Sequence, residues 1–221
     1  MSAAKHNSVP DRLEILQNDD AALKQVAQRY AVSVTDSVLQ TIKAPGDPVA
    51  LQYLPQAAEL VTRPEELRDP IGDKAHSPVR GIVHRYPDRV LLMPVNVCAV
   101  YCRFCFRREH IGPGQKALNP AELEAALDYI RSDKNIWEVI LSGGDPLILG
   151  AKRMREILRA LDDIEHVKII RIHTRIPVAD PARIDDDMCA ALQTQKPVYI
   201  LIHTNHAQEL SDDAAAAFKK L

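Results

Sequence analysis

From residue 90 onward, short apolar runs alternate with amphipathic segments, and this alternation limits the folds that the chain can adopt. The apolar runs, which are typical of buried strands, are residues 90–95, 137–141, 167–172 and 198–202. The segments with helical spacing are residues 120–132, 153–161, 185–193 and 211–221. Strands that alternate with helices in this way form right-handed βαβ units on a parallel sheet. The sequence therefore predicts an α/β fold with about four βα units, a partial (βα) barrel in residues 76–221.

The first 75 residues have a different pattern. Residues 22–30 have apolar side chains on one helical face, and residues 35–42 form a second expected helix with Ser33 or Thr35 as its N-cap. Turns rich in proline and glycine follow these helices, at residues 44–48 and 69–73. We expect residues 1–75 to form an N-terminal helical extension beside the barrel-like core.

The edges of such a sheet need a cover. An open edge strand offers unpaired backbone groups to other chains and favours aggregation. The N-terminal extension, another chain, or further βα units after Leu221 would cover it. We expect the last of these, so that the sequence would be the first part of a longer protein.

Polar clusters follow the expected strands at their C-terminal ends. These clusters are residues 97–110, 142–145, 173–175 and 203–206. Because the C-terminal ends of parallel strands meet at one edge of a sheet, functional residues gather there. The sequence therefore predicts that the four clusters form one shared site.

Three of the four cysteines lie in the first of these clusters, as Cys98, Cys102 and Cys105. In a reducing compartment, clustered cysteines favour metal binding or catalysis over a disulfide. A structural zinc ion needs four protein ligands, so it would require His110 or a remote residue; a redox-active pair is a further alternative. Three thiolates on a four-iron cluster leave one iron open to a substrate or cofactor. Cys189 has apolar helical neighbours and is expected in the core.

Charge and hydropathy exclude several functions. The formal net charge of −2 argues against a general nucleic-acid binder. No run of eighteen apolar residues is present, so no membrane span is expected. Residues 1–15 lack the apolar core of a secretory signal, which predicts a cytoplasmic location.

Five motifs give a sharper indication than any single cluster. In chain order they are HRYPDRVLL (84–92), YCRFCFRR (101–108), LSGGDPL (141–147), RIHTRIPV (171–178) and HTNHAQEL (203–210). Together they resemble the lysine 2,3-aminomutase family of radical S-adenosylmethionine enzymes. The resemblance covers about residues 76–210 and extends weakly into the N-terminal extension.

The resemblance implies a [4Fe-4S] cluster on Cys98, Cys102 and Cys105, with S-adenosyl-L-methionine at the open iron. One electron would cleave the sulfonium to a 5′-deoxyadenosyl radical. Pyridoxal 5′-phosphate would hold the substrate amino group as an imine while it moves from C2 to C3. The implied reaction converts L-lysine to β-lysine, an isomerase activity. The implied partners are an electron donor such as flavodoxin or ferredoxin and a second copy of the chain, with no nucleic acid and no membrane.

The resemblance also implies binding residues. Those expected at S-adenosyl-L-methionine are Ser142, Gly143, Gly144, Asp145, His173, His203 and Asn205. Those expected at the pyridoxal phosphate group are Arg85, Arg89 and Arg103, and Arg107 is expected to bind the substrate carboxylate. Guanidinium groups match phosphate and carboxylate geometry bidentately. A lone arginine is more often a solvated surface charge, and a lone histidine at a strand end is more often a structural hydrogen-bonding group.

The sequence departs from the family in two respects. In the family, later βα units contain the lysine that binds pyridoxal phosphate and the acidic residues that recognise the distal amine of the substrate. No residue here matches them, so no catalytic residue is assigned. The chain alone is therefore expected to be incomplete. Phe104 and Phe106 flank Cys105 as in the branch that isomerises lysine for elongation factor P, whereas residues 84–92 resemble the free-lysine branch. The alternatives are therefore that elongation factor branch, a glutamate or arginine 2,3-aminomutase, or a non-catalytic fragment that binds zinc or a cluster.

Overall fold

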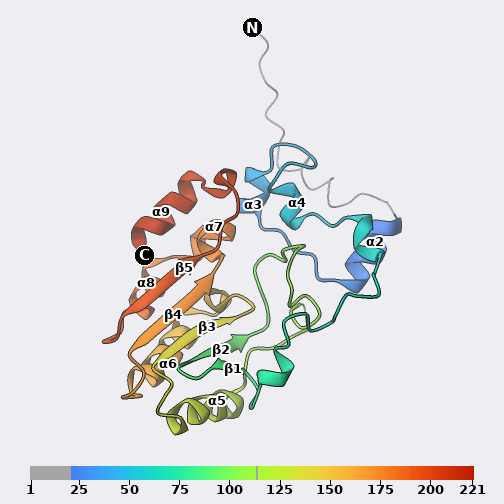
Figure 1. Ribbon diagram of the computed structural model, residues 1–221. Helices are drawn as coiled ribbons and strands as arrows, with labels where there is room; N and C mark the ends of the chain where they lie inside the picture. Colours follow the sequence, from blue (N-terminus) through green and yellow to red (C-terminus); the bar gives the residue numbers. More distant parts are fainter. Residues whose placement is uncertain (1–20, 113) are drawn as a thin grey trace.

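Five strands form one open sheet in the order β1-β2-β3-β4-β5 (Figure 1). The first strand, β1 (Ile82–Tyr86), is antiparallel to β2 (Arg89–Val95). The sheet continues with β3 (Glu138–Gly143), β4 (Ile169–Thr174) and β5 (Val198–Ile202), all parallel to β2. The predicted α/β fold with four βα units is confirmed, and the sheet does not close on itself.

The computed structural model describes residues 21–112 and 114–221. The prediction made from residues 1–15 lies outside this range. Within the described residues, the helices are all too short or too polar to cross a bilayer.

Each parallel strand is followed by a helix, as the pattern predicts. The helices after β2, β3, β4 and β5 are α5 (Pro120–Ser132), α6 (Ala151–Asp162), α7 (Ile176–Ala179) with α8 (Asp186–Ala191), and α9 (Asp212–Lys220). Short 3-10 turns complete the connections, at η3 (Pro146–Ile148), η4 (Pro181–Arg183) and η5 (Ala207–Glu209). The predicted elements differ from these bounds by up to two residues at each end.

Side chains at the helix starts explain why the helices begin where they do. The Asn119 side chain accepts a hydrogen bond from Glu122 N–H, and Glu122 accepts one from Asn119 N–H, while Pro120 occupies the first turn of α5. Ser211 caps α9 by accepting a hydrogen bond from Ala214 N–H, as predicted.

The main core lies between the sheet and these helices. Alternate strand residues such as Val90, Leu92, Val139 and Leu141 point to it, because side chains alternate between the faces of a strand. The helix α6 contributes Met154, Ile157, Leu158 and Leu161, all fully buried. Each fully buried side chain of this kind contributes about 1.5–3 kcal/mol. The opposite face of the sheet is free to form a site.

The N-terminal segment packs across the C-terminal end of the sheet (Figure 1). It contains α2 (Ala21–Arg29), α3 (Asp36–Thr41), α4 (Ala50–Tyr53), η1 (Ala57–Leu60) and η2 (Lys74–His76). A second core cluster joins α3 and α4 to Val100 of the cysteine loop and Ala179 of α7. Thr35 caps α3, and its hydroxyl also donates a hydrogen bond to Ala179 O. The predicted helical extension therefore contacts the predicted site directly, and its boundary at residue 75 stays a prediction.

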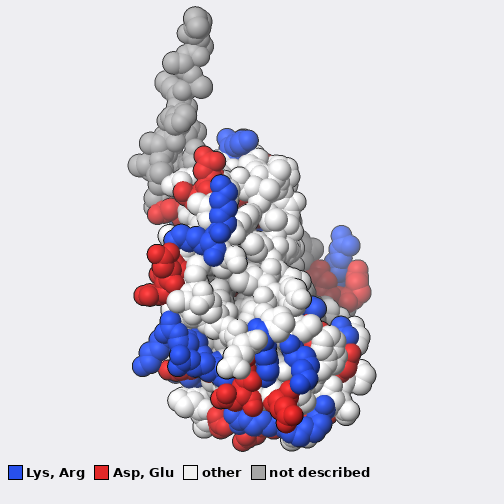
Figure 2. All heavy atoms as spheres, turned by 90° about the vertical axis from the view of Figure 1, so that its left-hand side faces the viewer, with Lys and Arg blue, Asp and Glu red and all other residues white. Residues whose placement is uncertain are grey.

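The strand β1 was missing from the sequence prediction. Its polar residues His84 and Arg85 are adjacent, so the alternation of a half-buried strand is interrupted. A tight connection, Tyr86 to Arg89, pairs β1 with β2. This hairpin covers one edge of the parallel strands, and β5 forms the other edge, with Tyr199 and Leu201 exposed. Seen from the side of α9 and β5, the middle of the surface is largely uncharged (Figure 2).

Asp88 stabilises the hairpin connection in a pH-dependent way. Its carboxylate accepts hydrogen bonds from Arg89 and from Trp137 Nε1, which lower the pKa of Asp88 from 3.8 to about 2. A depressed folded-state pKa stabilises the fold above the unfolded value and loses this effect as pH falls through the folded value. We expect Asp88→Asn to lower the thermal midpoint at neutral pH, with a difference that shrinks between pH 3.8 and about 2. Thermal unfolding across this range tests the expectation, and a pH-independent difference would contradict it.

Candidate active site

A cavity of about 530 Å³ lies at the C-terminal ends of the parallel strands. All four polar clusters that the sequence places at this edge contribute to its wall. The predicted site residues that line it are Cys98, Cys102, Cys105, Arg107, Ser142, Gly143, Gly144, Asp145, His173 and His203. The predicted residues outside its wall are Arg85, Arg89, Arg103 and Asn205. The expected convergence therefore holds for most of the site, and the exceptions are mainly the arginines.

The cysteine loop is a series of tight backbone turns. Cys105 N–H donates to Cys102 O at 3.0 Å, and Arg108 N–H donates to Cys105 O at 3.2 Å. The N-terminal segment holds this loop from outside, because Tyr101 N–H donates to Ser33 O at 3.1 Å and Arg103 N–H to Gln52 O at 2.7 Å. Backbone contacts within the loop and with the N-terminal segment thus fix its conformation.

The three loop cysteines are free thiols, and each is half-buried. Burial raises the pKa of Cys98, and the nearby Asp145 and Cys105 add to this effect. Burial also raises the pKa of Cys102, whereas the charge of Arg175 opposes the rise. Thiolates are the metal-binding form, so metal binding at these cysteines would release protons.

The donor set is three cysteines on one loop, the number of protein ligands that leaves one iron of a [4Fe-4S] cluster open. Within residues 21–112 and 114–221, no three side chains of His, Cys, Asp or Glu are placed to hold one ion. A [4Fe-4S] cluster instead takes one thiolate at each of several irons, so its cysteines surround a volume. Cys98, Cys102 and Cys105 share the wall of one cavity in this way.

Gly143 and Gly144, at the end of β3, lie too close to neighbouring backbone atoms to have a side chain. Gly143 has φ +109, and a Cβ there would lie 2.8 Å from Val95 O. At Gly144, a Cβ would overlap Val97 O and lie 2.6 Å from Val97 N. These positions let the turn pair with the segment that leads into the cysteine loop, through Gly144 N–H to Val95 O at 2.8 Å. Ser142 stands beside them in the cavity wall. The glycines thus serve backbone packing, and their predicted contact with S-adenosyl-L-methionine stays a prediction.

Asp145 is buried and joins three elements. Its carboxylate accepts hydrogen bonds from Leu147 N–H at 3.1 Å, Thr174 Oγ1 at 2.7 Å and Arg175 N–H at 2.6 Å. Burial raises the pKa of Asp145, and these hydrogen bonds act in the opposite direction. Both oxygens are therefore used within the protein, and Asp145 positions the ends of β3 and β4. Its predicted contact with S-adenosyl-L-methionine stays a prediction.

The histidines differ in their surroundings. His173 Nε2 is buried and, among the described residues, has no hydrogen-bond partner; burial and the charge of Arg171 lower the pKa of His173. Burial, and then Arg175, lower the pKa of His203, whose Nε2 lies 2.9 Å from Asn205 Oδ1. A lowered pKa favours the neutral form of each ring, which can accept as well as donate a hydrogen bond. Asn205 lies outside the cavity wall and contacts the ring of His203.

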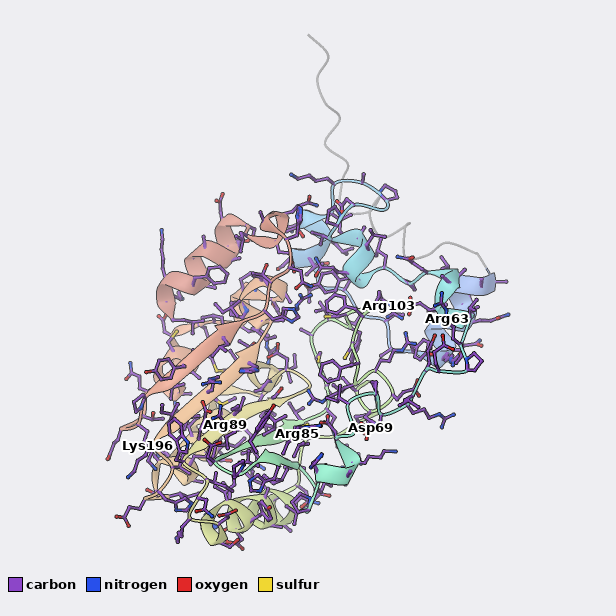
Figure 3. The ribbon with its side chains drawn as sticks, viewed as in Figure 1. Arg63, Asp69, Arg85, Arg89, Arg103 and Lys196 are labelled. Atoms are coloured by element: carbon purple, nitrogen blue, oxygen red, sulfur yellow. The ribbon has the colours of Figure 1, made fainter. Side chains whose placement is uncertain are left out.

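The three arginines predicted to bind phosphate lie in separate places (Figure 3). Arg85 donates to Ile71 O at 2.6 Å, and Arg89 forms an ion pair with Asp88 at 2.9 Å. Arg103 is buried on the far side of the cysteine loop, where it forms an ion pair with Glu59 at 2.6 Å. The described residues thus do not bring these guanidinium groups together as a phosphate cradle. Their role at pyridoxal phosphate stays a prediction.

Arg107 lies in the cavity wall, where a substrate carboxylate was expected. Its Nε donates to Asp73 Oδ2 at 2.8 Å, and its guanidinium stacks 4.6 Å from the Phe106 ring centroid. Asp73 also accepts from Arg85 at 3.3 Å. A carboxylate of the N-terminal segment therefore occupies one side of Arg107.

The sequence places Arg175 in the cluster at residues 173–175 but assigns it no role. It is 5% exposed, lines the cavity, and has Nη1 3.4 Å from Cys102 Sγ. The ring centroids of Tyr53 and Phe104 lie 5.3 and 5.5 Å from its Cζ. The RIHTRIPV motif contains this residue two positions after His173, so its place at a strand end was a usable signal.

Buried partners of Arg175 come from both ends of the chain. Tyr53 and Gln52 belong to α4, and Glu209 belongs to η5. Burial acts to raise the pKa of Glu209, but the hydrogen bond from Asn205 N–H and the charge of Arg175 outweigh it and hold the pKa below the usual value. No local pattern predicts this network, because Tyr53 is 122 residues from Arg175 and 156 residues from Glu209.

The fold and the cysteine-lined cavity are those of an α/β protein with a candidate cluster site at its strand ends. Residues 92–218 match the model of the Radical SAM superfamily. This chain belongs to that superfamily. It is 33% identical over 211 residues to the L-lysine 2,3-aminomutase of Acetoanaerobium sticklandii, covering 95% of this chain and 51% of the relative. The L-lysine 2,3-aminomutase of Methanococcus maripaludis is 40% identical over 177 residues, 79% of this chain and 40% of that protein. The glutamate 2,3-aminomutase of Clostridioides difficile is 34% identical over 211 residues, 95% of this chain and 50% of the relative.

The predicted resemblance to lysine 2,3-aminomutases is thereby confirmed, and the chain spans about half the length of these curated relatives. The superfamily and the relatives imply a [4Fe-4S] cluster, S-adenosyl-L-methionine and pyridoxal 5′-phosphate as cofactors. The residues around the cavity fit the first two groups. They do not form a site for the third, because the three predicted arginines are separate and paired with protein groups.

Proposed function

We propose that this chain forms the radical-generating part of an amino-acid 2,3-aminomutase, with L-lysine as the substrate. The observation that supports it most directly is the presence of Cys98, Cys102 and Cys105 in one cavity wall with the turn after β3 and the ends of β4 and β5. The bound cluster and S-adenosyl-L-methionine would supply a carbon-centred radical that abstracts hydrogen from the substrate.

The chain's own residues would perform three tasks. The cysteines would bind three irons and leave the fourth open to a ligand in the cavity. Ser142 and the neutral His173 and His203 would offer polar contacts to that ligand. Phe104 and Phe106 would limit the entry of water, which protects a reactive radical from side reactions. Arg107 would bind a carboxylate once Asp73 moves away.

The substrate proposal rests on the named relatives. Curated lysine 2,3-aminomutases and a glutamate 2,3-aminomutase have similar identities to this chain, so glutamate is the second candidate. Within the lysine enzymes, Phe104 and Phe106 beside Cys105 resemble the elongation factor P branch and residues 84–92 resemble the free-lysine branch, so both forms of lysine are candidates. We also propose a cytoplasmic location, flavodoxin or ferredoxin as the electron donor, and self-association.

Reductive cleavage of S-adenosyl-L-methionine tests the proposed function. The anaerobically reconstituted chain with dithionite is expected to release 5′-deoxyadenosine, and the triple variant Cys98/Cys102/Cys105→Ala is expected to lose this release by at least about a hundredfold. The reason is that no cluster remains to bind S-adenosyl-L-methionine and to reduce its sulfonium group. Cys189→Ala removes the cysteine outside the loop and serves as the matched control.

The outcome against the proposal is equal release from the wild type and the triple variant. Calorimetric titration of lysine and of glutamate into the reconstituted chain then separates the two substrates. The proposed substrate is expected to bind more tightly, and tighter binding of glutamate would replace lysine by glutamate.

A further inference from the structure

We propose that Arg175 is a positioning residue that stabilises negative charge on the Cys102 side of the cluster. Glu209 and Tyr53 would hold its guanidinium in place. The inference rests on the proposed function, because it concerns the cluster that the cysteine loop would bind.

The first observation is an incompletely bonded, buried cation. Arg175 is 5% exposed, and its Nε and Nη2 are buried without a hydrogen-bond partner among the described residues. Its Nη1 lies 3.4 Å from Cys102 Sγ. Burying a charged group with unused donors is costly unless an anion completes its contacts. The cavity wall to which Arg175 belongs contains three cysteines, so a thiolate-bound cluster supplies that negative charge.

The second observation is the set of contacts that fixes this cation. Nη1 lies 2.5 Å from the Tyr53 hydroxyl and 3.1 Å from Gln52 Oε1. Glu209 is 2% exposed, its Oε1 lies 3.8 Å from Nη1, and it also accepts from the Tyr53 hydroxyl at 3.1 Å. The N-terminal segment and the loop after β5 thus hold a single guanidinium against the cysteine loop.

These charges predict opposite effects on the cluster. A reduced cluster has one more negative charge than its oxidised form, so a fixed cation nearby favours reduction, and a fixed anion disfavours it. The effect is large at short distance in a dry site. Charge and hydrogen bonds near the sulfurs are known determinants of cluster reduction potential. Arg175 should therefore raise the potential, and Glu209 should lower it.

The test is a redox titration of the reconstituted full chain, followed by the electron paramagnetic resonance signal of the reduced cluster. At the wild-type midpoint, Arg175→Met is expected to decrease the ratio of reduced to oxidised cluster about tenfold, a shift of ~59 mV to lower potential for one electron. Arg175→Lys keeps the charge and is expected to shift less. Glu209→Gln is expected to shift the midpoint in the positive direction.

Arg183→Met is the matched control. Arg183 donates to the backbone carbonyls of Leu147 and Ile148 and lies outside the cavity wall, so the same loss of charge should leave the midpoint unchanged. Iron content is measured for every variant. If Arg175→Met binds no iron, Glu209→Gln decides: a positive shift supports the inference and an unchanged midpoint overturns it.

The outcomes separate the inference from the proposed function. Clusters with equal midpoints in wild type, Arg175→Met and Glu209→Gln would overturn the role of Arg175 and leave the proposed function intact. A wild-type chain that binds no cluster would overturn both.

Discussion

Gly144→Ala is expected to lower the free energy of unfolding by about 3 kcal/mol or more, the upper range of overpacking changes. The added methyl group would overlap Val97 O and lie 2.6 Å from Val97 N and 2.8 Å from Val97 C. These are backbone atoms, so no side-chain rotation relieves the overlap. Because Val97 begins the cysteine loop, relief requires a shift of the loop itself. Chemical denaturation gives the loss of stability, and iron content after reconstitution gives the effect on the site.

Gly150→Ala is the matched control for this prediction. A Cβ at Gly150 meets no atom within 4 Å, and the residue is the N-cap of α6 with φ −69. Replacing a glycine N-cap by alanine costs up to about 1 kcal/mol. Equal stabilities of the two variants would contradict the close approach of the turn and the cysteine loop.

Asp145→Ala is expected to lower the free energy of unfolding by about 3–5 kcal/mol. The carboxylate accepts three hydrogen bonds in the interior, from Leu147 N–H, Thr174 Oγ1 and Arg175 N–H, and each hydrogen bond to a charged group is worth about 1.5–3 kcal/mol. Truncation leaves these donors without partners where water has little access. Chemical denaturation measures the loss.

Asp145→Asn separates the shape of this side chain from its acceptors. The asparagine amide has the same shape as the carboxylate, but its NH₂ group donates where an oxygen accepted. At least one of the three hydrogen-bond donors that contact Asp145 would then face another donor. We expect an intermediate loss of stability. Ordinary surface substitutions change the free energy of unfolding by up to about 0.5 kcal/mol. If Asp145→Ala stays within this range of the wild type, the buried carboxylate does not join β3 to β4.

The elements that the sequence predicts correctly depend on local chemistry. Asn119, Pro120 and Glu122 define the start of α5 without reference to the rest of the fold. The parallel strands are apolar because one face of the sheet packs on the helices in the main core. The shared site at the strand ends follows from topology alone, so the convergence of the cysteine loop with Ser142 and His173 was also predictable.

The features that the sequence did not predict depend on long-range partners. Arg103 has the residue type of a phosphate ligand, yet it pairs with Glu59, which is 44 residues earlier in the chain. Arg175 lies 122 residues from Tyr53, so its burial was invisible in any local window. The hairpin strand β1 was missed because His84 and Arg85 interrupt its alternation. A residue type therefore indicates which chemistry is available, and the tertiary partners decide whether that chemistry is already used.

The content of iron and acid-labile sulfide tests the central claim most directly. After anaerobic reconstitution, the wild type and Cys189→Ala are expected to hold about four irons and about four sulfides per chain, whereas Cys98/Cys102/Cys105→Ala is expected to hold almost none. One stoichiometric zinc ion in place of iron, or an equal iron content in the triple variant, would contradict the assignment of a [4Fe-4S] cluster to the cysteine loop.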